Sequence, residues 1–220
     1  MKQPRWKVWL SYFTELVLER DATDLNPDLQ LGFNKGRYCL STPNAIYSYG
    51  DLYDNFYKAF QQINIKSLAL DEVLVLGFGL GSVPYMLEKS FQKKCTYTGV
   101  ELDETIVRWA TDYILDELES PVQLIISDAA IFTEISQQKF DLIAMDIFID
   151  NEIPAQFESI AFLENLDSML KEGGRLMYNR LALQDIDRKH TEDFFKTRFK
   201  SVFPKARYLD VGGNWILLNY

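Results

Sequence analysis

The stretch Asp71-Glu72-Val73-Leu74-Val75-Leu76-Gly77-Phe78-Gly79-Leu80-Gly81-Ser82 decides the fold of this chain. Val73 to Leu76 is apolar on both faces and predicts a buried parallel strand. Glycines at 77, 79 and 81 permit a tight turn and a close approach of backbone to ligand. Ser82 can then cap a helix whose apolar spacing continues to Phe91. A strand, a glycine turn and a helix N-terminus together predict a site for a nucleotide-bearing ligand.

An acid follows the next apolar run at the spacing that such sites use. Glu101 lies 20 residues beyond Gly81, at the end of Tyr97-Thr98-Gly99-Val100. A carboxylate at the tip of the adjacent strand can accept hydrogen bonds from both hydroxyls of a ribose. The pattern favours an adenosine-type ligand, either a dinucleotide or a nucleoside sulfonium. For a dinucleotide the third small position would fall on Ser82, which the glycine fingerprint accommodates poorly.

Composition restricts the class of protein. A length of 220 residues suits one domain with a small appendage, and contents of 47% hydrophobic and 25% charged residues are typical of a globular protein. The net charge of −9 argues against a nucleic-acid partner, which needs a basic face. No apolar run reaches the length of a membrane span, and the N-terminus lacks a signal-peptide core. We therefore expect a cytoplasmic protein without a membrane partner.

Cysteine and histidine are too sparse for several kinds of site. Cys39 and Cys95 are isolated, so neither a disulfide framework nor a zinc site is indicated. His190 is the only histidine and lies in a charged stretch that is typical of a surface. This scarcity argues against histidine-dependent catalytic triads and histidine-rich metal sites, and no metal is predicted. Proton transfer would have to depend on carboxylates, tyrosines or lysines.

Residues 1–45 predict a small N-terminal antiparallel β region. Its expected extended segments are Trp6–Tyr12, which alternates, Leu16–Leu18, and the strands Leu29–Phe33 and Arg37–Leu40 around the turn Asn34-Lys35-Gly36. An amphipathic helix rich in aromatic residues is expected from Tyr47 to Ile63.

Residues 46–220 predict a Rossmann-like α/β domain. Strands are expected near 73–76, 96–100, 122–126, 140–145 and 174–179, and helices near 82–91, 103–117, 129–135, 155–171 and 187–199. Such alternation implies right-handed crossovers and a parallel, doubly wound sheet. Two short strands around Gly212-Gly213 add an antiparallel last strand.

Acids stand at the ligand-binding edge of the predicted sheet, which lies outside the carboxyl ends of the strands. They are Glu101, Asp128, Asp146 and the nearby Asp150. Asp128 precedes a predicted helix and can equally be its N-cap. Asp146 precedes an apolar stretch that starts no helix, and a carboxylate against apolar neighbours tends towards a raised pKa, which suits a general base.

Seven segments in a fixed order carry a family resemblance. They are Gly36-Arg37-Tyr38, Tyr47-Ser48-Tyr49-Gly50-Asp51, Gly77-Phe78-Gly79-Leu80-Gly81, Val100-Glu101-Leu102-Asp103, Ser127-Asp128-Ala129, Phe140-Asp141-Leu142-Ile143-Ala144-Met145-Asp146 and Leu170-Lys171-Glu172-Gly173-Gly174. Together they resemble the spermidine synthase family, a branch of the S-adenosylmethionine-dependent methyltransferase superfamily. The resemblance covers roughly residues 15 to 220. It implies a small N-terminal β domain, a seven-stranded class I methyltransferase sheet and, usually, a homodimer.

The resemblance also implies site residues. Asp146 corresponds to the first aspartate of the family's Asp-Ser-Ser-Asp-Pro motif, which helps to deprotonate the attacking amine, and Tyr49 to the tyrosine that assists it. The residues that would bind the cofactor are Gly77, Gly79 and Gly81 around the nucleoside sulfonium, Glu101 on the ribose, and Asp128 with Ala129 beside the adenine amino group.

Three departures from the family pattern concern the polyamine half of the site. Leu80 replaces an aspartate that binds the donor's aminopropyl ammonium, and Gly50 replaces a glutamine that contacts the donor chain. The second motif aspartate, which anchors the acceptor, falls on Ile149, and Asp150 is one residue late. Replacing an anionic contact to a buried ammonium by leucine should cost several kcal/mol, on the order of an unpaired buried charge.

We therefore expect a transferase that binds S-adenosylmethionine and transfers its methyl group to an unidentified small-molecule acceptor, an amine being one candidate. The first alternative is an aminopropyltransferase that uses decarboxylated S-adenosylmethionine, with Asp150 in place of the missing acceptor contact. The second is a catalytically degenerate nucleoside-binding protein or dimeric scaffold.

Overall fold

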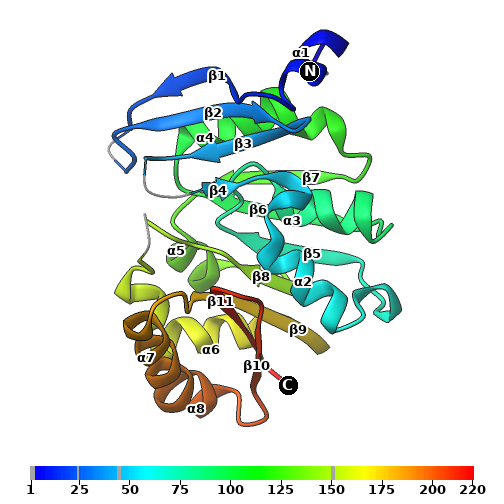
Figure 1. The fold of residues 1–220 in the computed structure, drawn as a ribbon. Helices are drawn as coiled ribbons and strands as arrows, with labels where there is room; N and C mark the ends of the chain where they lie inside the picture. The colour runs from blue at the N-terminus through cyan, green and yellow to red at the C-terminus, as the bar shows by residue number, and fades with distance from the viewer. Residues whose placement is uncertain (1–2, 24, 44–45, 150–151) are drawn as a thin grey trace.

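The computed structural model describes residues 3–23, 25–43, 46–149 and 152–220 and contains two sheets (Figure 1). The larger sheet has seven strands in the order β10-β11-β9-β8-β5-β6-β7, and the smaller has four in the order β1-β2-β3-β4. Strands β9, β8, β5, β6 and β7 are parallel, whereas β11 pairs antiparallel with both β9 and β10. This architecture confirms the predicted α/β class, the Rossmann-like methyltransferase sheet and its antiparallel C-terminal strand.

The elements of the larger unit alternate as the sequence predicts. The strands are β5 (Glu72–Leu76), β6 (Thr96–Glu101), β7 (Val122–Ile126), β8 (Phe140–Met145), β9 (Leu170–Leu181), β10 (Arg207–Asp210) and β11 (Asn214–Leu218). The helices are α2 (Asp54–Gln62), α3 (Ser82–Tyr85), α4 (Glu104–Trp109), α5 (Ala129–Ile135), α6 (Ile160–Ser168), α7 (Asp185–Phe194) and α8 (Lys200–Val202). Helices α3, α4 and α7 continue as π-helical turns over Met86–Ser90, Ala110–Ile114 and Phe195–Phe199.

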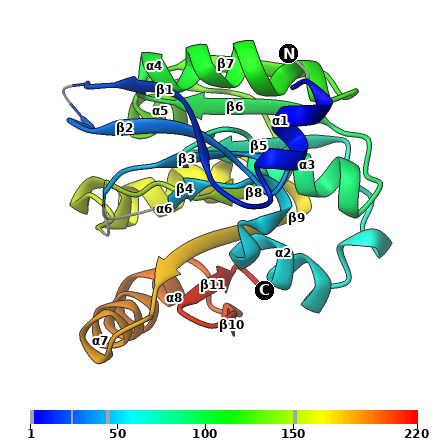
Figure 2. The ribbon, with the colours of Figure 1, turned by 45° about the horizontal axis from the view of Figure 1, so that its top comes forward.

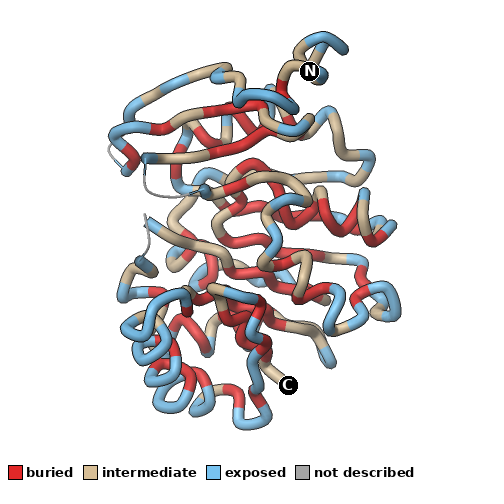
Figure 3. Tube along the Cα trace, viewed as in Figure 1, coloured by how far each residue is buried: buried red, intermediate tan, exposed pale blue. Residues whose placement is uncertain are grey.

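Alternate residues of the central strand β5 pack into two separate hydrophobic layers. Val73 and Val75 belong to the layer that includes Phe56 of α2 and Trp109 of α4, while Leu74 and Leu76 belong to the layer formed with α5, α6 and α7. All four strand residues are buried, as expected of a strand covered by helices on both faces. Figure 3 shows this buried interior running through the middle of the molecule.

The small sheet contains β1 (Leu16–Asp21), β2 (Leu29–Asn34), β3 (Arg37–Ser41) and β4 (Ile46–Ser48). Lys35 and Gly36 form the β2–β3 turn with φ values of 49° and 72°, as a two-residue hairpin loop requires. The small sheet extends to Ser48, beyond the predicted end of the N-terminal region at residue 45. The division of the chain into two domains at that residue stays a prediction.

The expected extended segment Trp6–Tyr12 is wrong, because Arg5–Leu10 is a helix, α1. Pro4 precedes the helix, and its carbonyl accepts from the backbone N–H groups of Lys7 and Val8. None of the α1 residues is buried, so no packed face supplied a period that the sequence could show.

The predicted helix from Tyr47 to Ile63 is correct only in its second half. Ile46–Ser48 pairs with β3 as strand β4, a 3₁₀ turn covers Gly50–Leu52, and helix α2 begins at Asp54. Pairing with a distant strand overrides the aromatic periodicity of the first half.

The small sheet is attached to the large one through α4 and the turn before it (Figure 2). Glu19 accepts hydrogen bonds from the Trp109 indole N–H at 2.6 Å and from the Tyr113 hydroxyl. Thr23 Oγ1 and Asn26 Nδ2 donate to Asp103 Oδ2 at 2.6 and 3.1 Å, which places the loop after β1 against the carboxyl end of β6. None of the helices in the described ranges combines the length and apolar character needed to cross a bilayer.

Candidate functional site

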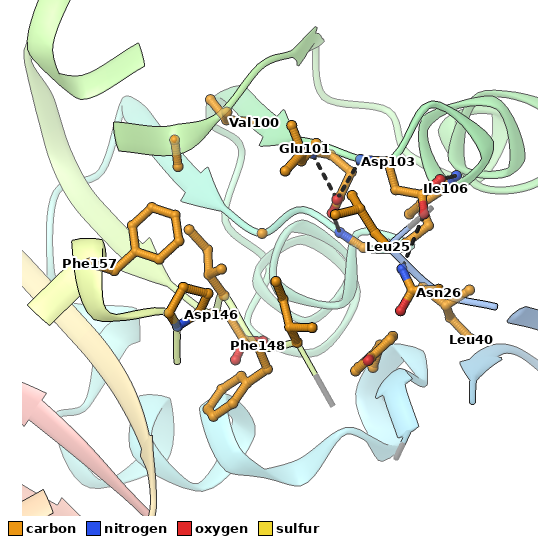
Figure 4. A pocket seen from close by; sticks show the side chains of 18 of the residues that line it. Leu25, Asn26, Leu40, Val100, Glu101, Asp103, Ile106, Asp146, Phe148 and Phe157 are labelled. Carbon is orange, nitrogen blue, oxygen red and sulfur yellow. Dashed lines mark hydrogen bonds between the residues drawn. The ribbon is translucent and has the colours of Figure 1, made fainter. Parts of the chain in front are cut away.

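A cavity of about 510 Å³ opens at the carboxyl ends of the parallel strands. Its walls include Gly77 after β5, Glu101 at the end of β6, Ser127 after β7 and Asp146 after β8. Cavities of roughly 300–1,000 Å³ are typical of small-molecule sites. Figure 4 draws Glu101, Asp103 and Asn26 on one side of this cavity and Asp146, Phe148 and Phe157 on the other.

The backbone of the glycine turn borders the cavity. Its conformation and its neighbours leave little room for a side chain on these residues. Gly77, Gly79 and Gly81 have φ values of 76°, 54° and 70°. A Cβ on Gly77 would lie 2.5 Å from the carbonyl oxygen of Asp146, which only glycine avoids. Gly77 and Gly79 line the cavity, whereas Gly81 is not among its lining residues and donates its N–H to the Phe78 carbonyl at 2.9 Å.

Glu101 lines the cavity and also fixes the turns around it. Its Oε2 accepts from the Gly79 backbone N–H at 2.9 Å, and its Oε1 accepts from those of Leu102 and Asp103 at 2.9 and 3.2 Å. Burial raises the pKa of this carboxyl, and the backbone donors partly oppose that shift. Each carboxylate oxygen has two lone pairs, so Oε1 is fully used by its two donors and Oε2 can still accept one hydrogen bond from a ligand.

Asp128 is the N-cap of α5, the role that the sequence left open for it. Its Oδ1 accepts from the Ala130 N–H at 2.7 Å and its Oδ2 accepts from Gln156 Nε2 at 2.9 Å. Asp128 and Ala129 nevertheless both line the cavity. Their contact with an adenine ring remains a prediction.

Asp146 is held by two side chains at the opposite end of the cavity. The Tyr53 hydroxyl and Asn179 Nδ2 donate to its Oδ1 at 3.3 and 2.8 Å. Its backbone N–H donates to the Leu76 carbonyl at 2.8 Å, which continues the β5–β8 ladder and fixes where the side chain begins. Desolvation by the surrounding protein raises the pKa of Asp146 to about 6, against the two donors that lower it.

Tyr53, and not Tyr49, is the tyrosine beside Asp146. Tyr49 is not among the lining residues, and its buried hydroxyl has no hydrogen-bond partner in the part of the chain that the structure describes. Tyr53 directly precedes α2, lines the cavity and has a raised pKa caused by burial and by the Asp146 charge. The role of Tyr49 stays a prediction, and the tyrosine that contacts Asp146 in the structure is Tyr53, because β4 and a 3₁₀ turn delay the start of α2.

The positions that depart from the family pattern have clear surroundings. Leu80 is buried in the hydrophobic core, and Gly50 has a φ of 51° beside Arg37. Ile149 lines the cavity and is 43% exposed, so an apolar side chain borders the site there. Asp150 lies outside the described residues.

Several lining residues carried no recognisable signal in the sequence. They are Leu25 and Asn26 from the loop after β1, Asn55 at the start of α2 and Asn214 of β11. Asn179, which contacts Asp146, is fully buried, and an asparagine inside an apolar strand is the one feature that could have indicated it.

Every charged side chain in the described lining of the cavity is acidic. Glu101, Asp103, Asp128 and Asp146 contribute carboxyl groups, and the described lining residues include no lysine, arginine or histidine. Such a wall favours a cationic ligand.

The chain has curated relatives in two transferase groups. It is 30% identical over 115 residues, 52% of its length, to a protein of Bifidobacterium longum named a probable polyamine aminopropyl transferase. It is 30% identical over 140 residues, 61% of its length, to the N-terminal histidine N-methyltransferase of Emericella nidulans. The chain covers 25% and 24% of the lengths of these relatives. No family profile matches it.

Solved structures match a larger part of the chain. A probable spermidine synthase from Corynebacterium glutamicum superposes on 92% of it and 78% of that chain, with a TM-score of 0.71 and 18% identity. The chain has a spermidine synthase-like fold. A spermidine synthase in complex with the transition-state analogue AdoDATO matches 92% of this chain and 72% of its own, with a TM-score of 0.67 and 16% identity.

Human methyltransferase-like protein 13, in complex with SAH, shares the fold over 70% of this chain and 72% of its own, with a TM-score of 0.55 and 23% identity. The resemblance to the spermidine synthase family within the methyltransferase fold is thus confirmed. The superpositions show the spermidine synthase-like fold, and the low sequence identities do not extend to activity.

Proposed function

We propose that the protein is an S-adenosylmethionine-dependent transferase that methylates an amine nitrogen of a small acceptor. The observation that carries the proposal is the placement of Asp146, a carboxyl with a pKa of about 6, in the same cavity as the glycine turn and Glu101. One end then holds an adenosyl group and the other accepts a proton. The names of the two curated relatives, an aminopropyl transferase and an N-methyltransferase, support transfer to nitrogen.

The residues at the glycine end fit the donor. Glu101 lines the cavity with a free lone pair on Oε2 for a ribose hydroxyl, and the Gly77 and Gly79 backbone borders the same space. Val100, Ile106 and Ala129 supply apolar walls of the kind an adenine ring packs against. Asp128, which lines the same cavity, is proposed to accept from the adenine amino group.

Asp146 supplies the proton acceptor. A bound ammonium gives one proton to the carboxylate, which leaves a neutral amine with a free lone pair and a protonated Asp146. S-adenosylmethionine, when bound, supplies an electrophilic methyl group whose carbon bonds to nitrogen as the carbon–sulfur bond breaks and its electron pair stays on sulfur. Tyr53 and Asn179 orient the carboxylate, and alignment within the cavity provides much of the rate.

Aminopropyl transfer is the second candidate, favoured by the name of the Bifidobacterium longum relative. Leu80 is buried in the core and offers no anionic partner to the aminopropyl ammonium of a decarboxylated donor. S-adenosylmethionine carries a carboxylate beside its ammonium, so its zwitterionic chain depends less on such a partner.

Calorimetry with S-adenosylmethionine, its decarboxylated form and methylthioadenosine tests the proposal. Tighter binding of the carboxylated donor supports methyl transfer. Tighter binding of the decarboxylated donor, together with methylthioadenosine release in the presence of putrescine, would replace it by aminopropyl transfer. No binding of any of the three would leave a degenerate protein or scaffold.

We also propose a cytoplasmic homodimer. Support for self-association comes from exposed aromatic residues near the N-terminus, which are Trp6, Trp9, Tyr12 and Phe13. Exposed apolar groups gathered in one segment are typical of interaction surfaces. Light scattering on the purified protein measures the oligomeric state, and a monomer at all concentrations would contradict the dimer.

A further inference from the structure

Among the described residues, the acceptor end of the cavity has one charged group, Asp146, with apolar side chains beside it. Three polar lining residues lie near Asp146 through direct or shared hydrogen bonds, Tyr53, Asn55 and Asn214, and none of them is charged at neutral pH. The apolar lining residues next to them in the chain or the sheet are Ile147, Phe148 and Ile149, which follow Asp146, and Leu181, which pairs with Asn214. Figure 4 shows Phe148 beside Asp146 and Phe157 on the same side of the cavity.

The other carboxyl groups are committed elsewhere. Glu101 accepts from the Gly79 N–H, Asp103 from the Thr105 N–H and Asp128 from the Ala130 N–H. All three stand at the ends of β6 and β7, on the side where the adenosyl group is proposed to bind. One acid, Asp146, therefore serves the acceptor end among the described lining residues.

Asp146 keeps an oxygen for a ligand. Among the described residues, hydrogen bonds reach only its Oδ1, from Tyr53 and Asn179. Oδ2 can accept from one ammonium group. Within the part of the chain that the structure describes, a second ammonium on the same molecule would meet isoleucine and phenylalanine side chains, and an unpaired charge is strongly disfavoured in such surroundings.

We propose that the acceptor is a monoamine with an apolar body, aromatic or branched aliphatic, and that Ile149 determines the preference over diamines. The inference rests on the proposed function and adds the substrate class. The amine pairs with Asp146, and the apolar body packs against Phe148, Ile149 and Leu181. Ile149 is 43% exposed, so its side chain is available for contact with a ligand.

Calorimetry with three probes tests the proposal, with and without saturating S-adenosylmethionine. The probes are phenethylamine, putrescine and 2-phenylethanol, which separate the contributions of the single amine, the second amine and the apolar body. We expect phenethylamine to bind at least tenfold more tightly than either of the others. Tighter binding of putrescine, equal binding of the two amines, or no detectable binding of phenethylamine would overturn the proposal.

Two aspartate substitutions make the test specific. Ile149→Asp adds a second acid to the acceptor end, and we expect it to improve putrescine affinity at least tenfold and weaken that of phenethylamine. Ile135→Asp adds the same charge at an exposed residue that is not in the cavity lining, and we expect no change in the preference. An unchanged preference in a folded Ile149→Asp protein would remove the assignment of Ile149.

Donor binding separates this inference from the proposed function. If S-adenosylmethionine binds and the monoamine preference is absent, only the substrate class is wrong. If S-adenosylmethionine does not bind, the proposed function is wrong, and the measurements without donor still decide whether the cavity prefers the monoamine. The thermal unfolding of each variant confirms that it is folded.

Discussion

Asn179 Nδ2 donates a hydrogen bond of 2.8 Å to Asp146 Oδ1. The sheet register produces this contact, because Met145 of β8 pairs with Tyr178 of β9. Asp146 directly follows Met145, and Asn179 directly follows Tyr178. Asn214 Nδ2 in turn donates to Asn179 Oδ1 at 2.9 Å, which fixes the amide orientation from the neighbouring strand β11. The proposed base is thus oriented by two buried or partly buried amides.

Asn179→Ala should raise the pKa of Asp146 further above its value of about 6, because the lost donor stabilises the ionised carboxylate. A hydrogen bond to a charged group contributes about 1.5–3 kcal/mol, which corresponds to a rise of about one to two pKa units. Carboxyl-carbon NMR titration measures this directly, with Asp146→Asn assigning the resonance. Asn214→Ala is the matched control, since it touches Asn179 and not Asp146, and its shift should be smaller. Identical titration of Asn179→Ala and the unaltered protein would show that the contact does not act on Asp146.

The two tyrosines make a second matched pair. Tyr53→Phe removes a donor to Asp146 and should reduce turnover about tenfold, the effect of one hydrogen bond, without changing donor affinity. Tyr49→Phe should leave turnover intact and increase the free energy of unfolding by up to about 1 kcal/mol, because the hydroxyl it removes is buried without a partner among the described residues. Turnover with an amine acceptor and denaturant unfolding check both variants. Loss of activity in Tyr49→Phe alone would support the predicted role of Tyr49.

The sequence could indicate the residues whose positions depend on local order. Glu101 and Asp146 each follow an apolar strand, and the alternation of strands and helices places all such residues at one edge of the sheet. The glycine turn is equally local, because Gly77, Gly79 and Gly81 all adopt positive φ. Both the α/β fold and the two ends of the cavity follow from these features.

The remaining site residues depend on contacts between distant segments. Tyr53 faces Asp146 because β4 pairs with β3 and delays the start of α2. Asn214 lies beside Asn179 because β11 pairs with β9. These two residues are 35 positions apart in the sequence, so no local pattern indicates their contact. Helix α1 was missed for a related reason, since none of its residues is buried and its pattern reflects no packing.

Glu101→Ala should weaken S-adenosylmethionine binding by at least about tenfold. The residue is proposed to take a ribose hydroxyl on Oε2, and a hydrogen bond to a charged group contributes about 1.5–3 kcal/mol. The Gly79 and Leu102 N–H groups also lose their acceptor, so their hydrogen exchange should accelerate while the rest of the fold is retained. Glu104→Ala, which removes an exposed acid three residues further on, should bind as the unaltered protein does. Calorimetry on the two variants decides, and full affinity in a folded Glu101→Ala protein would remove the donor site from the proposal.

Asp146→Asn should abolish transfer while keeping donor affinity, because asparagine preserves the size and an acceptor oxygen but cannot take a proton.

The same substitution, Asp146→Asn, should stabilise the fold at neutral pH. The folded pKa of about 6 exceeds the ordinary value of 3.8, so the folded state binds more protons between these values and its stability falls as the pH rises through this window. A difference of about two pKa units corresponds to about 3 kcal/mol, which is the upper limit of the gain expected for Asp146→Asn above pH 6. Below about pH 3 the two proteins should be equally stable, since Asp146 is then protonated in both states. Glu101, whose pKa is also raised by burial, is present in both proteins and cancels in the difference. Denaturant unfolding at pH 3 and pH 8, with turnover and calorimetry at pH 8, measures all three quantities on one variant. A stability difference that does not grow with pH would show that Asp146 is not held at a raised pKa, and an active Asp146→Asn protein would remove it as the base.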